Sequence, residues 1–128
     1  MQKLTPVLFV ESIEPCLPLW HALGYETTAE VPGEDGLGFA MLQHEGRVVM
    51  YQSYASVAAD LPALADEAKG SFTFLFVQVD DLEALKPALE GVEIVVPERE
   101  TFYGFRELGI RDAAGNVITL AQPLVEQG

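Results

Sequence analysis

The hydrophobic positions of this chain change spacing in the same order twice, from the spacing of a strand to that of a helix. In the first half, residues 5–10 form a short apolar run of strand length. Apolar residues then recur at every third position, at Leu17, Trp20 and Leu23, before Gly24. The run predicts a strand, and the stripe predicts an amphipathic helix that ends at the glycine.

A second copy of this plan begins near residue 72. Residues 72–79 predict its strand, and a helical stripe of leucines follows. Ser12 and Asp81 are the expected N-caps of the two helices. Both helices also carry a proline at the same place, Pro18 and Pro87, and we expect each proline to bend or shorten its helix.

The two halves align when the chain is shifted by 69 positions. The identities at this offset are Val10/Val79, Glu14/Glu83, Pro18/Pro87, Gly46/Gly115 and Val48/Val117. Each copy ends in two extended segments whose connection, 43–46 or 112–115, finishes in glycine and predicts a type I turn closed by a residue at positive φ. The order is therefore β-α-β-β-β, twice. It predicts an α+β fold in which two βαβββ modules form curved mixed β-sheets around a cleft, with the helices outside.

We expect a single domain with four parts. The first module covers residues 1–52 and the second covers 71–122. A linker with helix-forming alanines, 53–70, joins them, and 123–128 form a tail.

Composition narrows the class of protein. The net charge of −13, from 20 acidic and 7 basic residues, argues against a nucleic-acid partner, which needs clustered Lys and Arg. No apolar run approaches the roughly 20 residues of a membrane span, so we expect no membrane partner. The N-terminus lacks the pattern of a signal peptide, and the lone Cys16 cannot form an internal disulfide and is expected to be a small buried thiol. These features favour a cytoplasmic protein.

The element order and three segments resemble the vicinal oxygen chelate superfamily, which includes glyoxalase I, extradiol dioxygenases, fosfomycin-resistance enzymes and bleomycin-resistance proteins. The segments are LTPVLFVESIEPCLPLWHALGYE, FTFLFVQVDDLEAL and YGFRELGIRDAAGNVITLAQ. The third, with its G-x-R-E and R-D-x-A-G-N patterns and Tyr103 before the first glycine, is similar to the bleomycin-resistance branch. The resemblance implies the two-module fold predicted above.

The resemblance also implies four metal-ligand positions, which fall on Thr5, Met50, Phe74 and Thr119. None supplies an imidazole or a carboxylate, the groups that suit a divalent ion in such a site. We therefore expect no metal, no other cofactor and no catalytic residue. The two imidazoles, His21 and His44, share no motif and are expected at the surface or partly packed.

Aromatic and apolar residues on the inward faces of the strands are the candidate ligand-binding residues. They are Thr5, Phe39, Met50, Phe74, Phe76, Phe102, Tyr103 and Thr119. Flat rings with a few polar groups suit a planar, partly hydrophobic ligand, although such residues also commonly fill a core. Glu98, Glu100 and Glu107 are expected at the rim, where they could complement a cationic group of the ligand.

The sequence therefore predicts a metal-free protein that sequesters an aromatic or cationic small molecule, for which a bleomycin-type antibiotic is one candidate. The site would lie in a cleft between modules or between subunits, and the resemblance implies a homodimer. Two alternatives remain open. One is a lyase, isomerase or dioxygenase of the superfamily with an unusual metal site, and the other is an interaction module without a ligand.

Overall fold

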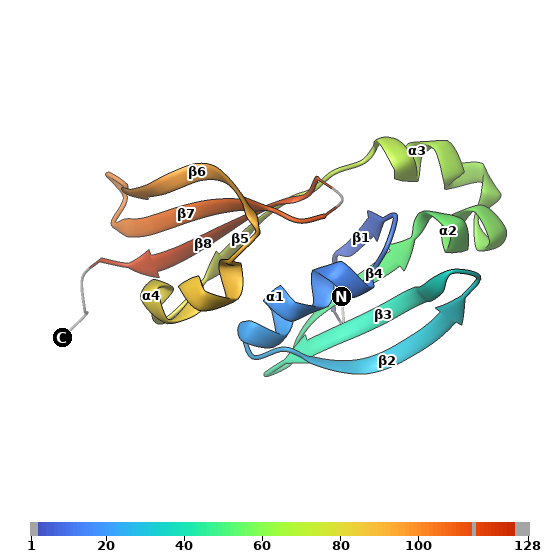
Figure 1. The fold of residues 1–128 in the computed structure, drawn as a ribbon, viewed down its shortest axis with the longest axis horizontal. Coiled ribbons are helices and arrows are strands. Elements are labelled where there is room, and N and C mark those ends of the chain that lie inside the picture. The colour runs from blue at the N-terminus through green and yellow to red at the C-terminus, as the bar shows by residue number, and fades with distance from the viewer. Residues whose placement is uncertain (1–2, 114, 125–128) are drawn as a thin grey trace. The chain divides into compact units, whose positions relative to one another are not determined.

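The structure is a computed structural model of the chain and describes residues 3–113 and 115–124 (Figure 1). The chain divides into two compact units, with the boundary between Phe72 and Thr73. Each unit contains one four-stranded mixed sheet with helices beside it. The predicted α+β fold with two βαβββ modules is confirmed. The predicted single domain, with its linker and tail, stays a prediction.

The sheet of the first unit has the strand order β1-β4-β3-β2. Its strands are β1 (Val7–Val10), β2 (Glu26–Gly33), β3 (Gly36–His44) and β4 (Arg47–Ser53). The helices are η1 (Glu14–Cys16), α1 (Leu17–Ala22), α2 (Tyr54–Asp60), η2 (Pro62–Leu64) and α3 (Ala65–Gly70). Strands β1 and β4 run parallel, and the other pairs are antiparallel. The last three helices thus fall in the segment predicted as a linker.

The second unit repeats this topology with the strand order β5-β8-β7-β6. Its strands are β5 (Phe74–Gln78), β6 (Glu93–Glu100), β7 (Phe105–Arg111) and β8 (Val117–Pro123), and its helices are α4 (Leu82–Leu85) and η3 (Lys86–Leu89). The parallel pair β5–β8 reproduces the register of β1–β4. Val7 faces Met50 and Phe76 faces Thr119, so both partners are related by the 69-residue offset.

Each unit has its own core on the helix side of its sheet. In the first unit, the indole Nε1 of Trp20 donates a hydrogen bond of 2.9 Å to the hydroxyl of Tyr51. Both side chains are almost fully buried, so the polar atoms of a large aromatic pair are satisfied inside the core. In the second unit, Leu82 and Leu89 are buried. The backbone N–H of Leu82 donates to Oε1 of Gln122 at 2.7 Å, which ties α4 to the sheet.

The helix ends agree with the sequence in part. Asp81 caps α4 by accepting from the N–H of Ala84 at 3.4 Å, as predicted. Ser12 does not cap a helix, because a 3-10 turn containing Pro15 comes first and neither η1 nor α1 has a side-chain cap. Pro18 lies in the first turn of α1, where its missing N–H costs nothing.

The predicted shortening is clear in the second unit, where α4 ends at Leu85 and the 3-10 helix η3, which contains Pro87, begins at Lys86. The two hairpin turns, in contrast, are not of one design. Glu45 and Gly46 both have positive φ (48° and 81°), as a two-residue type I′ turn requires. The β7–β8 connection is longer, and it has Gly115 at a φ of 102°.

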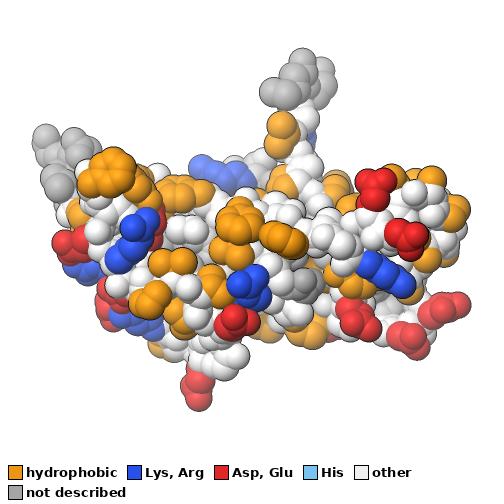
Figure 2. Space-filling model, turned by 90° about the horizontal axis from the view of Figure 1, so that it is seen from above, with side chains coloured by type: hydrophobic (Ala, Val, Ile, Leu, Met, Phe, Trp, Pro, Cys, Tyr) orange, Lys and Arg blue, Asp and Glu red, His pale blue; other side chains and the backbone are white. Residues whose placement is uncertain are grey.

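Among the described residues, no helix is long and apolar enough to cross a membrane. On the side seen in Figure 2, hydrophobic side chains reach the surface in several places, with basic and acidic side chains between them. Cys16 is 4% exposed, as expected for a buried thiol.

Candidate functional site

The sheet of the second unit has one face that its own helices do not cover, called here the open face. Strand alternation and register place Phe74, Phe76, Glu107, Gly109 and Thr119 on it. Gln122 and the residues that alternate with it face α4 instead. The open face is where a ligand could reach the sheet of this unit.

Large apolar side chains lie exposed on this face. Phe74 is 70% exposed and Phe76 is 55% exposed, although both belong to a strand. A scattered exposed apolar residue needs no explanation, but adjacent aromatic side chains along one strand face are typical of an interaction site. Phe74 and Phe76 therefore form the first edge of the candidate site.

Small side chains occupy the centre of the open face. One row runs in register across all four strands and consists of Phe76, Thr119, Gly109 and Val96. A Cβ at Gly109 would lie 2.9 Å from the Cβ of Val96, so the two strands approach too closely for any other residue to fit there without a shift. The side chain of Val96 therefore covers Gly109, and the rings of β5 lie on the other side of Thr119 in this row.

A chain of aromatic rings continues from β5 to the start of β7 and the turn before it. The rings of Phe76 and Phe105 meet edge to face at a centroid distance of 5.5 Å. Phe105 is 6.0 Å from Tyr103, and Tyr103 is 5.1 Å from Phe102, again edge to face. Such geometries add a modest stabilisation to each ring pair. The predicted residues Phe76, Phe102 and Tyr103 are thus brought together through Phe105.

The turn that carries Phe102 and Tyr103 is tightly built. The hydroxyl of Thr101, itself 8% exposed, accepts from the N–H of Phe105 at 3.0 Å, and Gly104 has a φ of 94°. Phe102 is 100% exposed at the tip of this turn. Backbone hydrogen bonds between Thr101 and Phe105 and between Gly104 and Thr101 fix the shape of this turn. This shape directs the side chains of Phe102 and Tyr103 toward solvent.

A buried carboxylate lies beside the rings. Glu107 is 4% exposed, and its Oε2 accepts a hydrogen bond of 2.5 Å from the hydroxyl of Tyr103. Its Oε1 accepts from Nη2 of Arg99 at 3.3 Å. The hydrogen bond to Glu107, with burial and the negative charge of that carboxylate, raises the pKa of Tyr103 above its ordinary value. Tyr103 therefore stays protonated at neutral pH, with its hydroxyl fixed in direction.

The first unit holds the other three predicted ligand-binding residues. Tyr51 bonds to Trp20 of α1, so its neighbours on β4, Met50 and Gln52, point to the opposite face of the sheet. Phe39 is in register with Gln52 and lies on that same face. Phe39 and Met50 are both half-buried. Thr5 precedes β1 and is half-buried. All three residues belong to the first unit, and their part in one site with the second unit stays a prediction.

The acids predicted at the rim are engaged with bases. Glu98 lies 2.7 Å from Nζ of Lys86 and 3.7 Å from Nε of Arg106, and Glu100 lies 3.0 Å from Nη2 of Arg106. Arg106 alternates with Glu107 and so faces the helix side of the sheet. Glu107 is buried, so its expected place at the rim is wrong. A role of Glu98 and Glu100 toward a cationic group of a ligand stays a prediction.

Within residues 3–113 and 115–124, no group of three or more His, Cys, Asp and Glu side chains is placed to hold a metal ion. Phe74 and Thr119 lie on the open face, while Thr5 and Met50 belong to the first unit. His21 is exposed, with Nε2 at 2.9 Å from the hydroxyl of Thr27, and His44 is half-buried beside Tyr25. Whether the protein is metal-free stays a prediction.

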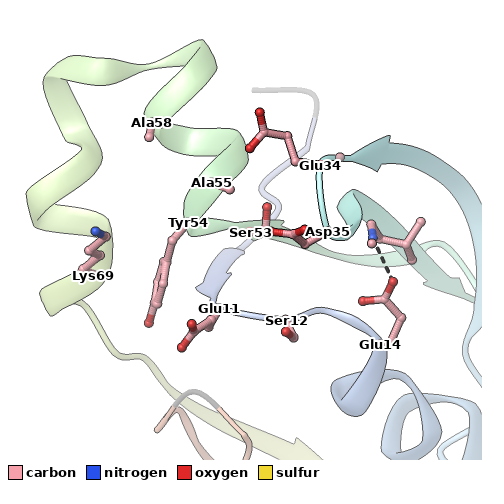
Figure 3. A pocket seen from close by; sticks show the side chains of 13 residues that line it. Glu11, Ser12, Glu14, Glu34, Asp35, Ser53, Tyr54, Ala55, Ala58 and Lys69 are labelled. Carbon is pink, nitrogen blue, oxygen red and sulfur yellow. Dashed lines mark hydrogen bonds between the residues drawn. The ribbon is translucent and has the colours of Figure 1, made fainter.

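A pocket of about 330 Å³ opens in the first unit, between the β2–β3 hairpin and the helices after β4 (Figure 3). The charged residues that line it are mostly acidic, and Lys69 is the single base among the lining residues. Glu14 accepts from the N–H of Leu37 at 2.8 Å, and this hydrogen bond holds the pKa of Glu14 below its usual value. Glu14 thus fixes the hairpin tip, where a side chain on Gly36 would collide with its carboxylate.

Solved structures of known proteins share this architecture. TioX from Micromonospora sp. ML1 superposes with a TM-score of 0.72 at 17% identity, over 97% of this chain and 100% of TioX. A glyoxalase/bleomycin resistance protein/dioxygenase family enzyme from Burkholderia phytofirmans PsJN gives 0.74 at 19% identity, over 94% and 97%. The chain has the glyoxalase/bleomycin resistance protein/dioxygenase fold. The predicted resemblance is thereby confirmed at the level of the fold.

A third structure with the glyoxalase-type fold is TnmS3, an antibiotic binding protein from Streptomyces sp. CB03234. It gives a TM-score of 0.63 at 24% identity, over 96% of this chain and 97% of TnmS3. Comparison with protein-family models and with curated protein sequences gives no match. Proteins with this fold thus include a named antibiotic binder and a named family enzyme.

Sequence reasoning missed three residues of the open face. Phe105 precedes Glu107 by two positions in a strand, so alternation alone would have placed it beside the predicted rings. Arg99 stands between two acids, which is typical of a solvated surface run, and nothing local in the sequence links it to its partner Glu107 on the next strand. Gly109 gives no signal in a single sequence, since only the approach of Val96 shows why it lacks a side chain.

Proposed function

We propose that the protein binds a planar aromatic small molecule against the open face of the second unit, without a metal ion, and sequesters it. The supporting observation is the continuous set of rings, Phe76, Phe105, Tyr103 and Phe102, together with the exposure of Phe76 and Phe102. Exposed rings held in fixed positions offer stacking area for a flat ligand.

The expected strength of this contact is moderate. Full burial of a phenyl side chain stabilises by about 1.5–3 kcal/mol, and Phe74 and Phe76 are 70% and 55% exposed. Covering both rings therefore contributes about 2–4 kcal/mol, which alone corresponds to weak, roughly millimolar binding or weaker. Tight binding requires a second surface. The proposal accordingly includes the predicted cleft, with Phe39, Met50 and Thr5 of the first unit or of a second subunit in a homodimer as the opposite wall.

The comparison with TnmS3 supports binding over catalysis, because that protein is named for binding an antibiotic. An antibiotic of the bleomycin type remains one candidate ligand, and a cytoplasmic location remains part of the proposal. The enzyme hypothesis has support from the family enzyme of Burkholderia phytofirmans PsJN, which shares the fold. It would need metal ligands other than Thr5, Met50, Phe74 and Thr119.

A fluorescence titration with 9-anthracenemethanol, a neutral planar probe, tests the proposal. We expect saturable binding that survives prior treatment with EDTA. Phe76→Ala is expected to raise the Kd about five- to tenfold, since half a ring of apolar contact is lost. Leu64→Ala is the matched control, because Leu64 is an apolar residue 41% exposed on η2, which belongs to the first unit and not to the sheet of the second.

Each contrary outcome indicates a specific alternative. An unchanged Kd in Phe76→Ala would place the site elsewhere. Binding that EDTA abolishes and a divalent metal restores would favour the enzyme hypothesis. Absence of saturable binding to this probe and to other planar compounds would favour an interaction module.

A further inference from the structure

The charged residues of the open face are arranged in two ion pairs across β6 and β7. Arg111 lies 3.4 Å from Glu93, and Arg99 lies 3.3 Å from Glu107. Each pair is also a register pair of the two strands. The open face is therefore locally neutral, although the chain as a whole carries a charge of −13.

The pair nearest the rings is unequal in its access to solvent. The side chain of Glu107 is 5% exposed, whereas that of Arg99 is 54% exposed. Both carboxylate oxygens of Glu107 already accept hydrogen bonds, one from Tyr103 and one from Arg99. A ligand cation would thus meet a carboxylate that is covered and occupied.

Arg99, in contrast, retains hydrogen-bond donors. Its Nη2 serves both Glu107 and, at 3.4 Å, the hydroxyl of Tyr103. Over the described part of the chain, Nη1 and Nε of Arg99 have no hydrogen-bond partner. A guanidinium has five N–H donors and suits planar oxygen acceptors such as a carboxylate.

Resting on the proposed function, we propose that the ligand is a planar aromatic compound with an anionic oxygen group, and that Arg99 binds this group beside the rings. Glu107 is a positioning residue in this scheme, because its bonds to Arg99 and Tyr103 hold both groups in place before the ligand arrives. The rings bind the body of the ligand, and the guanidinium selects its charge.

The negative charge of the chain opposes an anion only at long range. At physiological ionic strength, charges are screened over roughly 8 Å, so a direct contact with Arg99 outweighs distant acids. Because Arg99 is half exposed, the preference is expected to be moderate, about five- to tenfold in Kd, and to weaken as salt is added.

Three probes with one ring system test the charge preference: 9-anthracenecarboxylate, neutral 9-anthracenemethanol and cationic 9-(aminomethyl)anthracene. We expect the wild type at about 0.15 M salt to bind the carboxylate at least about fivefold more tightly than the ammonium probe. Arg99→Gln is expected to remove this preference, and Arg99→Lys to keep part of it. Arg47→Gln makes the same change of net charge in the first unit and is expected to have no effect.

The outcomes separate this inference from the proposed function. Equal affinity for all three probes, unchanged in Arg99→Gln, would overturn the inference and leave the aromatic site intact. Tighter binding of the ammonium probe would overturn it in favour of a cation site. Binding of none of the probes would overturn both proposals. Circular dichroism of Arg99→Gln checks that the variant is folded.

Discussion

Gly109 offers a sharp test of the packing beneath the open face. In Gly109→Ala the new methyl carbon would lie 2.9 Å from Cβ and 3.0 Å from Cγ2 of Val96, well inside ordinary van der Waals contact. Overpacking of this kind costs about 1–3 kcal/mol. Replacing glycine also reduces the entropy of the unfolded chain, which offsets about 0.4–1 kcal/mol. We therefore expect a net loss of about 1–2 kcal/mol in the free energy of unfolding.

A double-mutant cycle with Val96→Gly isolates the contact. The free energies of unfolding of the wild type, both single variants and the double variant are measured in urea by circular dichroism. If the collision with Val96 is the cause, the cost of Gly109→Ala should fall to near zero or below in the Val96→Gly background. Gly70→Ala is a control, because nothing lies within 4 Å of the position that its new methyl carbon would take.

Two results would refute this reasoning. One is a Gly109→Ala protein as stable as the wild type, which would mean that β6 moves aside at no cost. The other is a loss of stability that is the same with and without the side chain of Val96, which would assign the effect to something other than this contact. A raised Kd for 9-anthracenemethanol in Gly109→Ala is expected as well, because the methyl group would push the side chain of Val96 out of its place on the open face.

Three further predictions concern charged and phenolic groups. Glu107→Gln should lower the free energy of unfolding in urea by about 1–3 kcal/mol, because the amide cannot accept from both Tyr103 and Arg99 as the carboxylate does. Glu100→Gln, at an exposed position, should cost less than about 0.5 kcal/mol, and equal costs for the two variants would contradict this. Titration of tyrosine absorbance in the wild type and in Tyr103→Phe should give, by difference, a midpoint for Tyr103 above pH 10.0. The stability that the bond from Tyr103 to Glu107 contributes is present below pH 10.0 and should be lost as the pH rises through the pKa of Tyr103 in the folded protein. The pKa of Glu14 is lowered, so Glu14→Gln should be less stable than the wild type above about pH 4.5. The urea midpoints of the two proteins should converge as the pH falls through the pKa of Glu14 in the folded state, and a constant difference between them would argue against the bond to Leu37.

The repeated order of elements could be predicted from sequence because each element depends on local patterns. Asp81, Gly24 and Gly91 are local signals for helix ends, and the structure places the glycines at φ of 95° and 83°. Ser12 shows the limit of such signals. A serine before a helical stripe is a common cap, but Pro15 favours a 3-10 turn that moves the start of the helix beyond its reach.

The apolar part of the candidate site could be predicted from the sequence, but its polar part could not. Alternation along one strand places Phe74 and Phe76 on the same face, and this needs no knowledge of other strands. The pairing of Arg99 with Glu107 depends on the register of β6 against β7, which includes two irregularities between residues 94 and 99. No single-strand pattern contains that information, so Glu107 was expected at the rim although it is buried and paired with Arg99.

Chemical-shift mapping of the ¹⁵N-labelled protein with 9-anthracenecarboxylate, in the presence of EDTA, tests the central claim most directly. The account predicts saturable shifts concentrated in β5, in the turn from Thr101 to Gly104, and in the central residues of β7 and β8. Shifts confined to the acidic pocket around Glu14, or shifts that vanish when EDTA is added, would contradict it.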